Sequence, residues 1–502
     1  MEGKTEALIS ELRSLVSKLL AYEQATGIMY YDAATGAPRG GAAERGKTLA
    51  VLSEVVYRLQ TGEETGELLS ALQERREELD PITRREVSEL WRDYQRTKKI
   101  PMEEYVAYEV LLNEADAVWH RAKVESDWPA FEPYMEKIVE FNRKLARWLE
   151  PEMAPYDALL DQYERGLTTE KLDAFFAVLK ERLVPLIRKI TLQGKQPKDI
   201  FAGKEFPLEA QRQLSDWLMA AIGIDREYCS IGETEHPFTT GWSRRDVRIT
   251  THYHMEEPLS SLYSVVHEGG HALYELNVAE ELQGTVLAGG AAMSIHESQS
   301  RFFENIIGRS RGFIRNLLPE LRRLFPEQMA GIGEEELYRT ANISRPSLIR
   351  TEADELTYSL HVLLRYELEK QLIDGSLAVK DLPRAWNAKM KEYLGLEVPD
   401  DRQGVLQDSH WSGGSIGYFP SYALGSAYGA QLLAKMKETM DVDAVIASGD
   451  LKPIRDWLTE RIWSKGSLYD PQEIFLQAAE APFDPTCYTD YLTKKYSELY
   501  GV

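Results

Sequence analysis

The sequence SVVHEGGHALYELN, residues 264–277, contains the most informative motif of the 502-residue chain. Its centre is HEGGH, which places His267 and His271 four residues apart. On an α-helix, residues at this spacing lie about 40° apart around the axis and one turn apart along it. Both imidazoles can therefore reach one metal ion from the same face. A chain of this composition contains about 0.02 random matches to the pattern, so we interpret the motif as a metal site.

The residues between the two histidines also carry information. Glu268 stands beside the first histidine, as in H-E-x-x-H zinc proteases, where this carboxylate takes a proton from a metal-bound water. Gly269 and Gly270 are poor helix formers, and they would let a substrate backbone or a neighbouring helix approach closely. The motif therefore predicts attack by a metal-activated water.

A catalytic zinc usually has three protein ligands and one open position. We expect the third ligand at Glu297, because a downstream carboxylate has this place in glutamate-type zincins. His296 is the alternative. Adjacent helical residues point about 100° apart, so only one of the two can face the metal. This ligand set suits one Zn²⁺ ion, although Co²⁺ or Mn²⁺ could bind the same side chains.

The apolar spacing elsewhere predicts an all-α fold with one small β element. The β element lies within 236–254, where residues 246–250 alternate in polarity. It could pair with an extended substrate or form a purely structural hairpin. Besides the metal helix and a second helix that begins near His296, helices are expected at 4–25, 43–61, 64–78, 81–99, 101–126, 128–150, 168–192, 207–222, 311–325, 334–343, 351–374, 381–394, 426–438, 442–449, 452–464, 471–480 and 486–499, with a turn-rich segment at 32–41 and a long loop at 404–425.

The composition limits the class of protein. No linker or repeat divides the chain, so we expect one catalytic domain over 1–502, with a helical N-terminal lobe at about 1–230, the metal region at about 231–430 and C-terminal helices at about 431–502. A net charge of −22 argues against binding to nucleic acid or to anionic membranes. The acidic N-terminal residues do not form a signal peptide, and no apolar run could span a bilayer. We therefore expect a cytoplasmic protein.

Several further motifs resemble one family, the carboxypeptidase Taq metallocarboxypeptidases, over nearly the whole chain. They are HPF at 236–238, DVRIT at 246–250, HEGGH at 267–271, HESQ at 296–299, IRTEAD at 349–354, GVLQDSHW at 404–411 and GSIGYFPSY at 414–422. The resemblance implies a two-lobed helical body around a long deep groove, a homodimer, a gluzincin-type zinc site that includes Glu297, and removal of C-terminal residues from peptides. One departure is visible, because Tyr31-Asp32 stands where the family usually has Trp-Asp.

Hydrolysis of a peptide develops an oxyanion that hydrogen-bond donors must stabilise. His410 and Tyr422 are the expected donors, because neurolysin-type peptidases place His and Tyr at the same separation around a Gly-Tyr pair. Tyr418 is the alternative to Tyr422.

A carboxypeptidase must also recognise the free terminal carboxylate, and the planar fork of arginine suits this task. Arg350 is the first candidate and Arg248 the second. The alternative for Arg350 is an ion pair with a neighbour such as Glu352 or Asp354.

Other side chains of these motifs complete the predicted site. His236 could contact substrate or make a structural hydrogen bond, and Asp354 and Asp408 could orient ligand or catalytic histidines. We expect a carboxypeptidase of broad specificity acting on peptides with a free C-terminus, with Glu268 as general base and then general acid. The alternatives are an oligoendopeptidase with the same metal chemistry and a non-catalytic metal-dependent peptide-binding protein.

Overall fold

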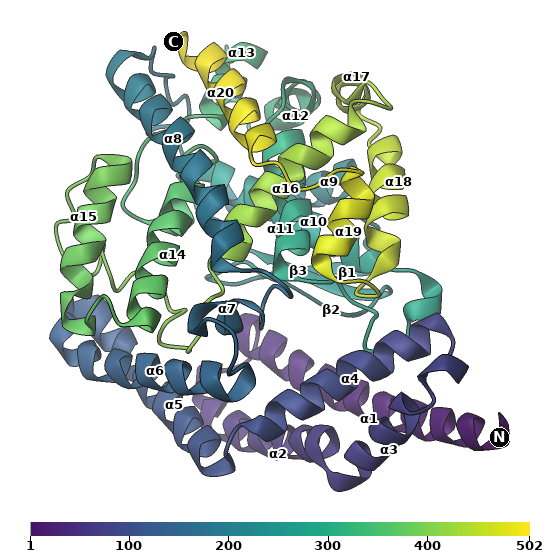
Figure 1. Ribbon diagram of the computed structural model, residues 1–502. Helices are drawn as coiled ribbons and strands as arrows, with labels where there is room; N and C mark the ends of the chain where they lie inside the picture. The colour runs from purple at the N-terminus through teal and green to yellow at the C-terminus, as the bar shows by residue number, and fades with distance from the viewer. Residues whose placement is uncertain (1) are drawn as a thin grey trace.

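The helices between residues 2 and 149 form the lower part of the molecule in Figure 1. The computed structural model describes residues 2–502. The lower helices are α1 (Glu2–Thr35), α2 (Ala42–Thr61), α3 (Glu63–Gln73), α4 (Pro81–Lys99), α5 (Met102–Glu125) and α6 (Trp128–Leu149). A small apolar core joins α1, α3 and α4, whereas α5 and α6 belong to the main core; the small core consists of Leu12, Val16, Leu69, Leu72, Leu79, Val87 and Tyr94.

The remaining helices lie above this layer, and α10, α11 and α16 are the central ones among them (Figure 1). They are α7 (Pro155–Leu160), α8 (Thr169–Gln193), α9 (Leu208–Ile222), α10 (Pro258–Leu276), α11 (Met293–Arg301), α12 (Arg311–Leu324), α13 (Glu334–Ala341), α14 (Tyr358–Asp374), α15 (Leu382–Leu394), α16 (Pro420–Met436), α17 (Val442–Ser448), α18 (Lys452–Arg461), α19 (Pro471–Ala479) and α20 (Thr486–Tyr500).

Glycines bring the central helices together. A Cβ at Gly270 of α10 would lie 2.7 Å from the backbone of α11, and one at Gly425 of α16 would lie 2.6 Å from the Cβ of Glu297. Gly269 similarly faces Ile222 of α9. The glycines of HEGGH therefore admit neighbouring helices, which is one of the two outcomes expected from the sequence.

A three-stranded sheet lies between the lower helices and α10 (Figure 1). It consists of β1 (Cys229–Glu233), β2 (Thr239–Ser243) and β3 (Asp246–Thr251), in the order β1-β3-β2. β1 pairs with β3 in parallel, with Cys229 opposite Val247, and β2 pairs with β3 antiparallel, with Thr239 opposite Ile249. The predicted strand at 246–250 is thus confirmed, but both its edges are occupied, so β3 itself cannot pair with a substrate. β2 is the edge strand on the groove side.

Several boundaries differ from the predictions; for example, the helix predicted at 64–78 ends at Gln73, and α7 was not predicted. Three of the differences have an identifiable cause. α1 continues ten residues beyond residue 25, because Gly27 packs closely against the indole of Trp242 in β2 and the helix runs on to Thr35. The helix predicted from 351 begins at Tyr358, since the Asp354 carboxylate accepts hydrogen bonds from the backbone N–H groups of residues 356 and 357 and holds a turn there. The predicted loop at 404–425 ends early, because Pro420 opens α16 and places Tyr422 on a helix.

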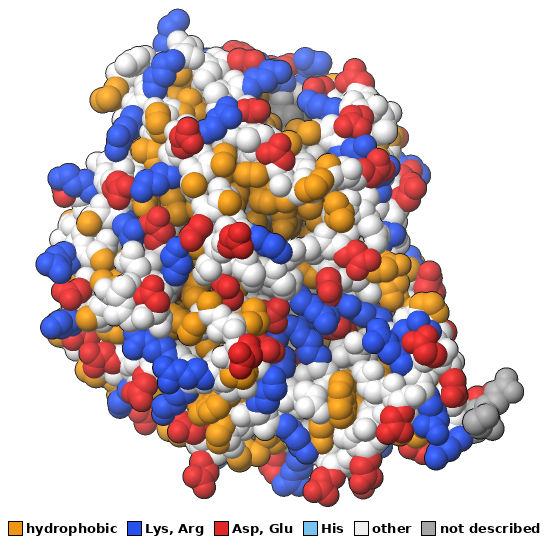
Figure 2. All heavy atoms as spheres, in the orientation of Figure 1, with side chains coloured by type: hydrophobic (Ala, Val, Ile, Leu, Met, Phe, Trp, Pro, Cys, Tyr) orange, Lys and Arg blue, Asp and Glu red, His pale blue; other side chains and the backbone are white. Residues whose placement is uncertain are grey.

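The fold is predominantly helical with a small sheet beside the metal helix, as predicted. The division into lobes stays a prediction. Figure 2 shows acidic and basic side chains interspersed over one face despite the net charge of −22. Within residues 2–502, no helix is long and apolar enough to cross a bilayer.

Candidate metal centre and substrate groove

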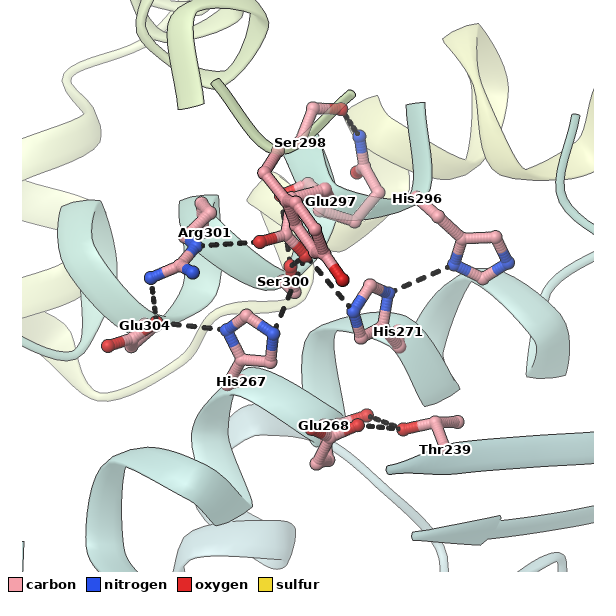
Figure 3. A network of polar contacts seen from close by, with 12 residues as sticks. Thr239, His267, Glu268, His271, His296, Glu297, Ser298, Ser300, Arg301 and Glu304 are labelled. Carbon is pink, nitrogen blue, oxygen red and sulfur yellow. Dashed lines mark hydrogen bonds and ion pairs between the residues drawn. The ribbon is translucent and has the colours of Figure 1, made fainter. Parts of the chain in front are cut away.

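Two helices bring three ligand atoms together. His267 and His271 project from α10, and Glu297 projects from α11 toward both rings (Figure 3). Oε2 of Glu297 lies 3.5 Å from Nε2 of His267 and 3.4 Å from Nε2 of His271, and one ligand atom from each residue lies within 4.8 Å of the others. Two imidazoles and a carboxylate at this spacing fit a divalent ion with an open coordination position.

Two of the three candidate ligands, His271 and Glu297, have protonation states that suit metal binding. Burial lowers the pKa of the third, His267, but the carboxylates of Glu297 and Glu304 raise it overall, so a metal ion would displace a proton there. Burial lowers the pKa of His271, which favours the neutral imidazole that a metal requires. Burial alone would raise the pKa of Glu297, but the guanidinium of Arg301 and the imidazoles of His267 and His271 hold it well below its usual range. Glu297 is therefore an anion in spite of being almost fully buried.

An acidic and a basic residue support the first histidine and the carboxylate. Oε2 of Glu304 lies 2.9 Å from Nδ1 of His267, and Nε of Arg301 donates to Oε1 of Glu297 at 2.8 Å. Arg301 also donates to Glu304 at 3.2 Å, which closes the network in Figure 3. Glu304 lies in a π-helical segment, Phe302–Ile307, that directly follows α11. Such segments occur frequently at functional sites, and this one sets the orientation of Glu304. The sequence analysis missed both residues, although their spacing of four and seven from Glu297 placed them on its helix face.

His296 stands outside the ligand triad. Its Nδ1 lies 3.1 Å from Nδ1 of His271, and its Nε2 lies 2.7 Å from Oε1 of Glu275. His271 is thus held by a histidine that is itself held by a carboxylate. Partners of this kind fix the orientation of a metal ligand.

Glu268 lies beside the triad and has a different partner. Its carboxylate accepts a hydrogen bond of 2.6 Å from Oγ1 of Thr239, at the start of the edge strand β2 (Figure 3). The same hydroxyl lies 3.0 Å from the backbone carbonyl of Glu268. β2 therefore positions the expected general base, and Thr239 was not foreseen in the sequence.

A groove of about 1320 Å³ runs past the triad. Its walls come from α10, the edge strand β2, the segment around Arg350 and the loop before α16. The predicted site residues that line it are His236, Glu268, Arg350, Asp354, Asp408, His410 and Tyr422, together with the three candidate ligands. Tyr418 and Arg248 are not among the lining residues.

The two expected oxyanion donors meet on one wall. Nε2 of His410 lies 3.2 Å from the hydroxyl of Tyr422. Burial, followed by the charge of Arg350, lowers the pKa of His410 to about 4, so the ring is neutral at pH 7. Burial raises the pKa of Tyr422 well above its usual value, which keeps its O–H available as a donor. Tyr418 packs edge-on against Tyr422, with ring centroids 5.3 Å apart.

Arg350 is buried and paired, but with Asp408 instead of Glu352 or Asp354. Its Nε and Nη2 each lie 2.9 Å from Oδ1 of Asp408, and its Nη1 donates to the hydroxyl of Tyr358 at 3.0 Å. Neither Glu352 nor Asp354 is the partner, because residues 350–352 form a 3-10 turn and the backbone N–H of Arg350 donates to the side chain of Gln407, which directly precedes Asp408.

The two aspartates of the motifs do not orient histidines. Asp408 binds Arg350 and Arg365, whereas Asp354 accepts from Ser344 and Thr357. No hydrogen bond joins either aspartate to a histidine in residues 2–502.

Arg248 lies away from the groove. It forms a bidentate ion pair with Asp246 and packs over the rings of Tyr31 and Trp242, with its guanidinium carbon 5.2 and 4.6 Å from their centroids. Arg248 thus fastens α1 to the sheet, and we propose no substrate contact for it. Tyr31, the departure from the family pattern, belongs to this structural contact.

A helical body with an H-E-x-x-H helix, a third carboxylate on a following helix and a deep groove defines a metallopeptidase of the gluzincin type. The family model of carboxypeptidase Taq (M32) metallopeptidases matches residues 11–496. The chain therefore belongs to this family and is a metal-dependent carboxypeptidase, as predicted.

Named relatives agree along nearly the full length. Carboxypeptidase 1 of Bacillus subtilis (strain 168) is 41% identical over 491 residues, which cover 98% of each chain. Thermostable carboxypeptidase 1 of Pyrococcus furiosus is 36% identical, over 97% of this chain and 98% of that protein. The crystal structure of the M32 carboxypeptidase from Deinococcus radiodurans R1 has a TM-score of 0.96 at 35% identity, covering 99% of this chain and 100% of that one. These similarities favour the carboxypeptidase over the oligoendopeptidase and the non-catalytic alternative.

Proposed function

We propose that this carboxypeptidase uses Zn²⁺ at His267, His271 and Glu297 and that Glu268 is its general base and acid. The arrangement of Glu268 beside the three convergent ligand atoms carries the proposal. When bound, the ion would supply Lewis acidity that makes a water nucleophilic near neutral pH and polarises the scissile carbonyl.

The proton transfers fall to Glu268. Its carboxylate accepts a proton from the attacking water and then delivers it to the amine that leaves, so the residue ends the cycle ionised. The hydrogen bond from Thr239 restrains the orientation of the carboxylate. His410 and Tyr422 lie on the groove wall as neutral donors, and we propose that they stabilise the oxyanion.

Arg350 is proposed to bind the terminal carboxylate of the peptide. A guanidinium has five N–H groups, and Asp408 and Tyr358 accept from Nε, Nη2 and Nη1. One hydrogen on each terminal nitrogen is therefore left over by these contacts, which is the pair that a bidentate carboxylate needs. Asp408 keeps the fork oriented. His236, exposed on the groove wall, is proposed as a further substrate contact.

We also propose that the enzyme is a cytoplasmic homodimer of broad specificity, on the strength of its composition and of its resemblance to the family. Its substrates would be peptides with a free C-terminus, without nucleic acid or membrane partners. Light scattering of the purified chain tests the dimer, and metal analysis after expression in defined medium tests zinc against cobalt and manganese.

The mechanism is tested with Glu268→Gln, which keeps the shape of the side chain and removes the base. We expect kcat to fall by roughly 10³-fold or more while zinc affinity stays near the wild-type value, because Glu268 is not a ligand. The exposed Glu281→Gln is the matched control and should retain activity. Full hydrolysis by Glu268→Gln with zinc bound would refute the mechanism. Equal cleavage of a peptide and its C-terminal amide would favour the oligoendopeptidase instead.

A further inference from the structure

A buried carboxylate lies behind the loop that carries His410. Glu369 of α14 is 0% exposed and accepts three hydrogen bonds. Trp411 donates from Nε1 to Oε1 at 2.7 Å, and the backbone N–H of Gly417 donates to Oε2 at 2.8 Å. The third donor is the hydroxyl of Tyr156 in α7, 2.7 Å from Oε2. Glu369 does not line the groove, so it has no direct part in binding substrate.

Two of these donors belong to one short loop segment, residues 411–417. Trp411 directly follows His410, and Gly417 directly precedes Tyr418. One carboxylate therefore ties together both ends of the segment that separates the histidine from the tyrosine pair. The ring of His410 has one hydrogen-bond contact, between its Nε2 and the hydroxyl of Tyr422, and its Nδ1 is buried without a partner in the described chain.

Two glycines allow the loop to pack closely against neighbouring helices near Glu369. Gly417 has φ +98°, and a Cβ there would lie 3.1 Å from the backbone of Leu159 in α7. Gly414 has φ +75°, and a Cβ there would lie 2.5 Å from the hydroxyl of Tyr108. Both glycines let the loop pass close to these helices in a conformation that other residues rarely adopt. The loop therefore packs against α7 at Gly417, the residue whose N–H shares the Glu369 carboxylate with Tyr156.

The chemical identity of residue 369 matters because of the number of donors. An ionised carboxylate has about four acceptor sites and no donor, so it can satisfy all three groups at once. A glutamine of the same shape has one oxygen and a donating NH₂ group, and it would leave at least one donor unpaired. Burial raises the pKa of Glu369 to about 7 although its three hydrogen bonds lower it, so the group is mostly ionised only above neutral pH, and its burial has a cost that an apolar residue would avoid.

We propose that Glu369 is a positioning residue of the hydrolytic reaction, which holds segment 411–417 so that His410 keeps its orientation toward the groove. The proposal rests on the proposed role of His410 as an oxyanion donor. Glu369 therefore affects kcat, through the stabilisation of the transition state by His410. It does not affect the binding of the peptide terminus or of the metal.

The test uses Glu369→Gln in the metal-loaded full chain. Hydrogen exchange of the Gly417 amide should become at least about tenfold faster, because the amide oxygen of glutamine is a weaker acceptor than a carboxylate and cannot bond Gly417 and Trp411 together. The value of kcat should fall roughly 10- to 100-fold, while KM and zinc affinity change less than about threefold. Glu367→Gln is the matched control, because Glu367 lies on the same helix and binds Lys389 and Tyr393 away from the loop.

The outcomes separate the two proposals. If His410→Gln is impaired and Glu369→Gln exchanges faster at Gly417 but keeps the wild-type kcat, Glu369 does not position the histidine. If His410→Gln itself retains the wild-type kcat, the role of His410 fails, whatever the loop does. Trp411→Phe provides a second variant should Glu369→Gln misfold, because it deletes one donor and keeps an aromatic side chain. An unchanged kcat there also overturns the proposal.

Discussion

Two glutamates beside the same pair of histidines have different surroundings and therefore different chemistry. Glu297 contacts Arg301 and both imidazoles, which hold its pKa down and keep it a permanent anion. The partner of Glu268 is the neutral hydroxyl of Thr239. Environments that separate two carboxylates in this way are typical of a ligand and a proton carrier.

The proposed role of Arg350 leads to a prediction about substrate choice. Arg350→Lys keeps the positive charge but loses the planar fork, so one point contact replaces two parallel hydrogen bonds. We expect kcat/KM for free-acid peptides to fall roughly 10- to 100-fold, and the preference for the free acid over the C-terminal amide to shrink by the same factor. Steady-state kinetics with matched acid and amide peptides measure both quantities. An undiminished preference in Arg350→Lys would exclude Arg350 as the carboxylate anchor.

His410 makes stability depend on pH in a defined window. Its pKa is lowered from 6.5 to about 4, so between these values the unfolded chain binds a proton that the folded chain does not. The free energy of unfolding must therefore fall as pH drops from 6.5 toward 4. We expect denaturation at pH 7 and at pH 5 to show a loss about 1 to 2 kcal/mol larger in the wild type than in His410→Gln. Equal losses would mean that the ring is protonated in the folded protein.

At the scale of elements, local sequence signals predicted most helices, but they failed where contacts between residues distant in sequence determine where a helix ends. The prediction of 81–99 was correct because Asp80 caps the helix and Pro81 opens it, and both lie within four residues of the start. The extension of α1 depends instead on its packing against the sheet, where Gly27 lies under the indole of Trp242. No local pattern in α1 reports that contact.

The same distinction holds for the site. His267, Glu268 and His271 share one turn of helix, so their spacing alone predicted them. The contact of Thr239 with Glu268 joins residues 29 positions apart, and that of Arg350 with Asp408 joins residues 58 positions apart. Both contacts form only when the chain has folded. Glu369 was not predicted for the same reason, since its partners lie in α7 and in the loop that carries His410.

The contact between α11 and α16 predicts a coupling between packing and metal affinity. A Cβ at Gly425 would lie 2.6 Å from the Cβ of Glu297, so Gly425→Ala must displace the ligand or its helix. We expect zinc affinity to fall roughly 10- to 100-fold and the free energy of unfolding to fall by about 1 to 3 kcal/mol. Competition with a chromogenic chelator gives the affinity. Gly429→Ala, one turn further along α16, is the control. A Cβ there would lie 3.3 Å from the backbone oxygen of Ser298, so the variant should leave the zinc affinity near the wild-type value.

At the scale of the molecule, the groove depends on contacts between the lower helices and the main body. Trp119 and Lys123 of α5 line the groove and donate hydrogen bonds to the carbonyls of residues 406 and 407, at 3.0 and 2.8 Å. Helix α5 therefore supports the segment that carries Asp408 and leads to His410. Three helices, α5, α7 and α14, thus contact the loop that carries His410, whereas the proposed metal ligands come from two helices, α10 and α11.

This difference predicts how the protein responds to loss of its metal. The ion would link only α10 and α11, and without it Glu297 keeps its bonds to Arg301 and Ser300 while His267 keeps Glu304. Because no buried charge loses its partner, the metal-free protein should stay folded. Its free energy of unfolding should be lower by the linkage amount alone, about 2.7 kcal/mol when free zinc is 100 times its Kd and about 4.1 kcal/mol at 1,000 times.

Thermal unfolding after treatment with a chelator, followed by titration with zinc, measures this dependence. The Tm should rise steadily with the logarithm of free zinc in the wild type and stay constant in Glu297→Gln, whose amide cannot replace the carboxylate. Glu281→Gln should follow the wild type, which separates ligand loss from a general effect of charge. Collapse of the wild type into an unfolded chain on chelation would show instead that the metal, and not the Arg301 network, holds α10 and α11 together.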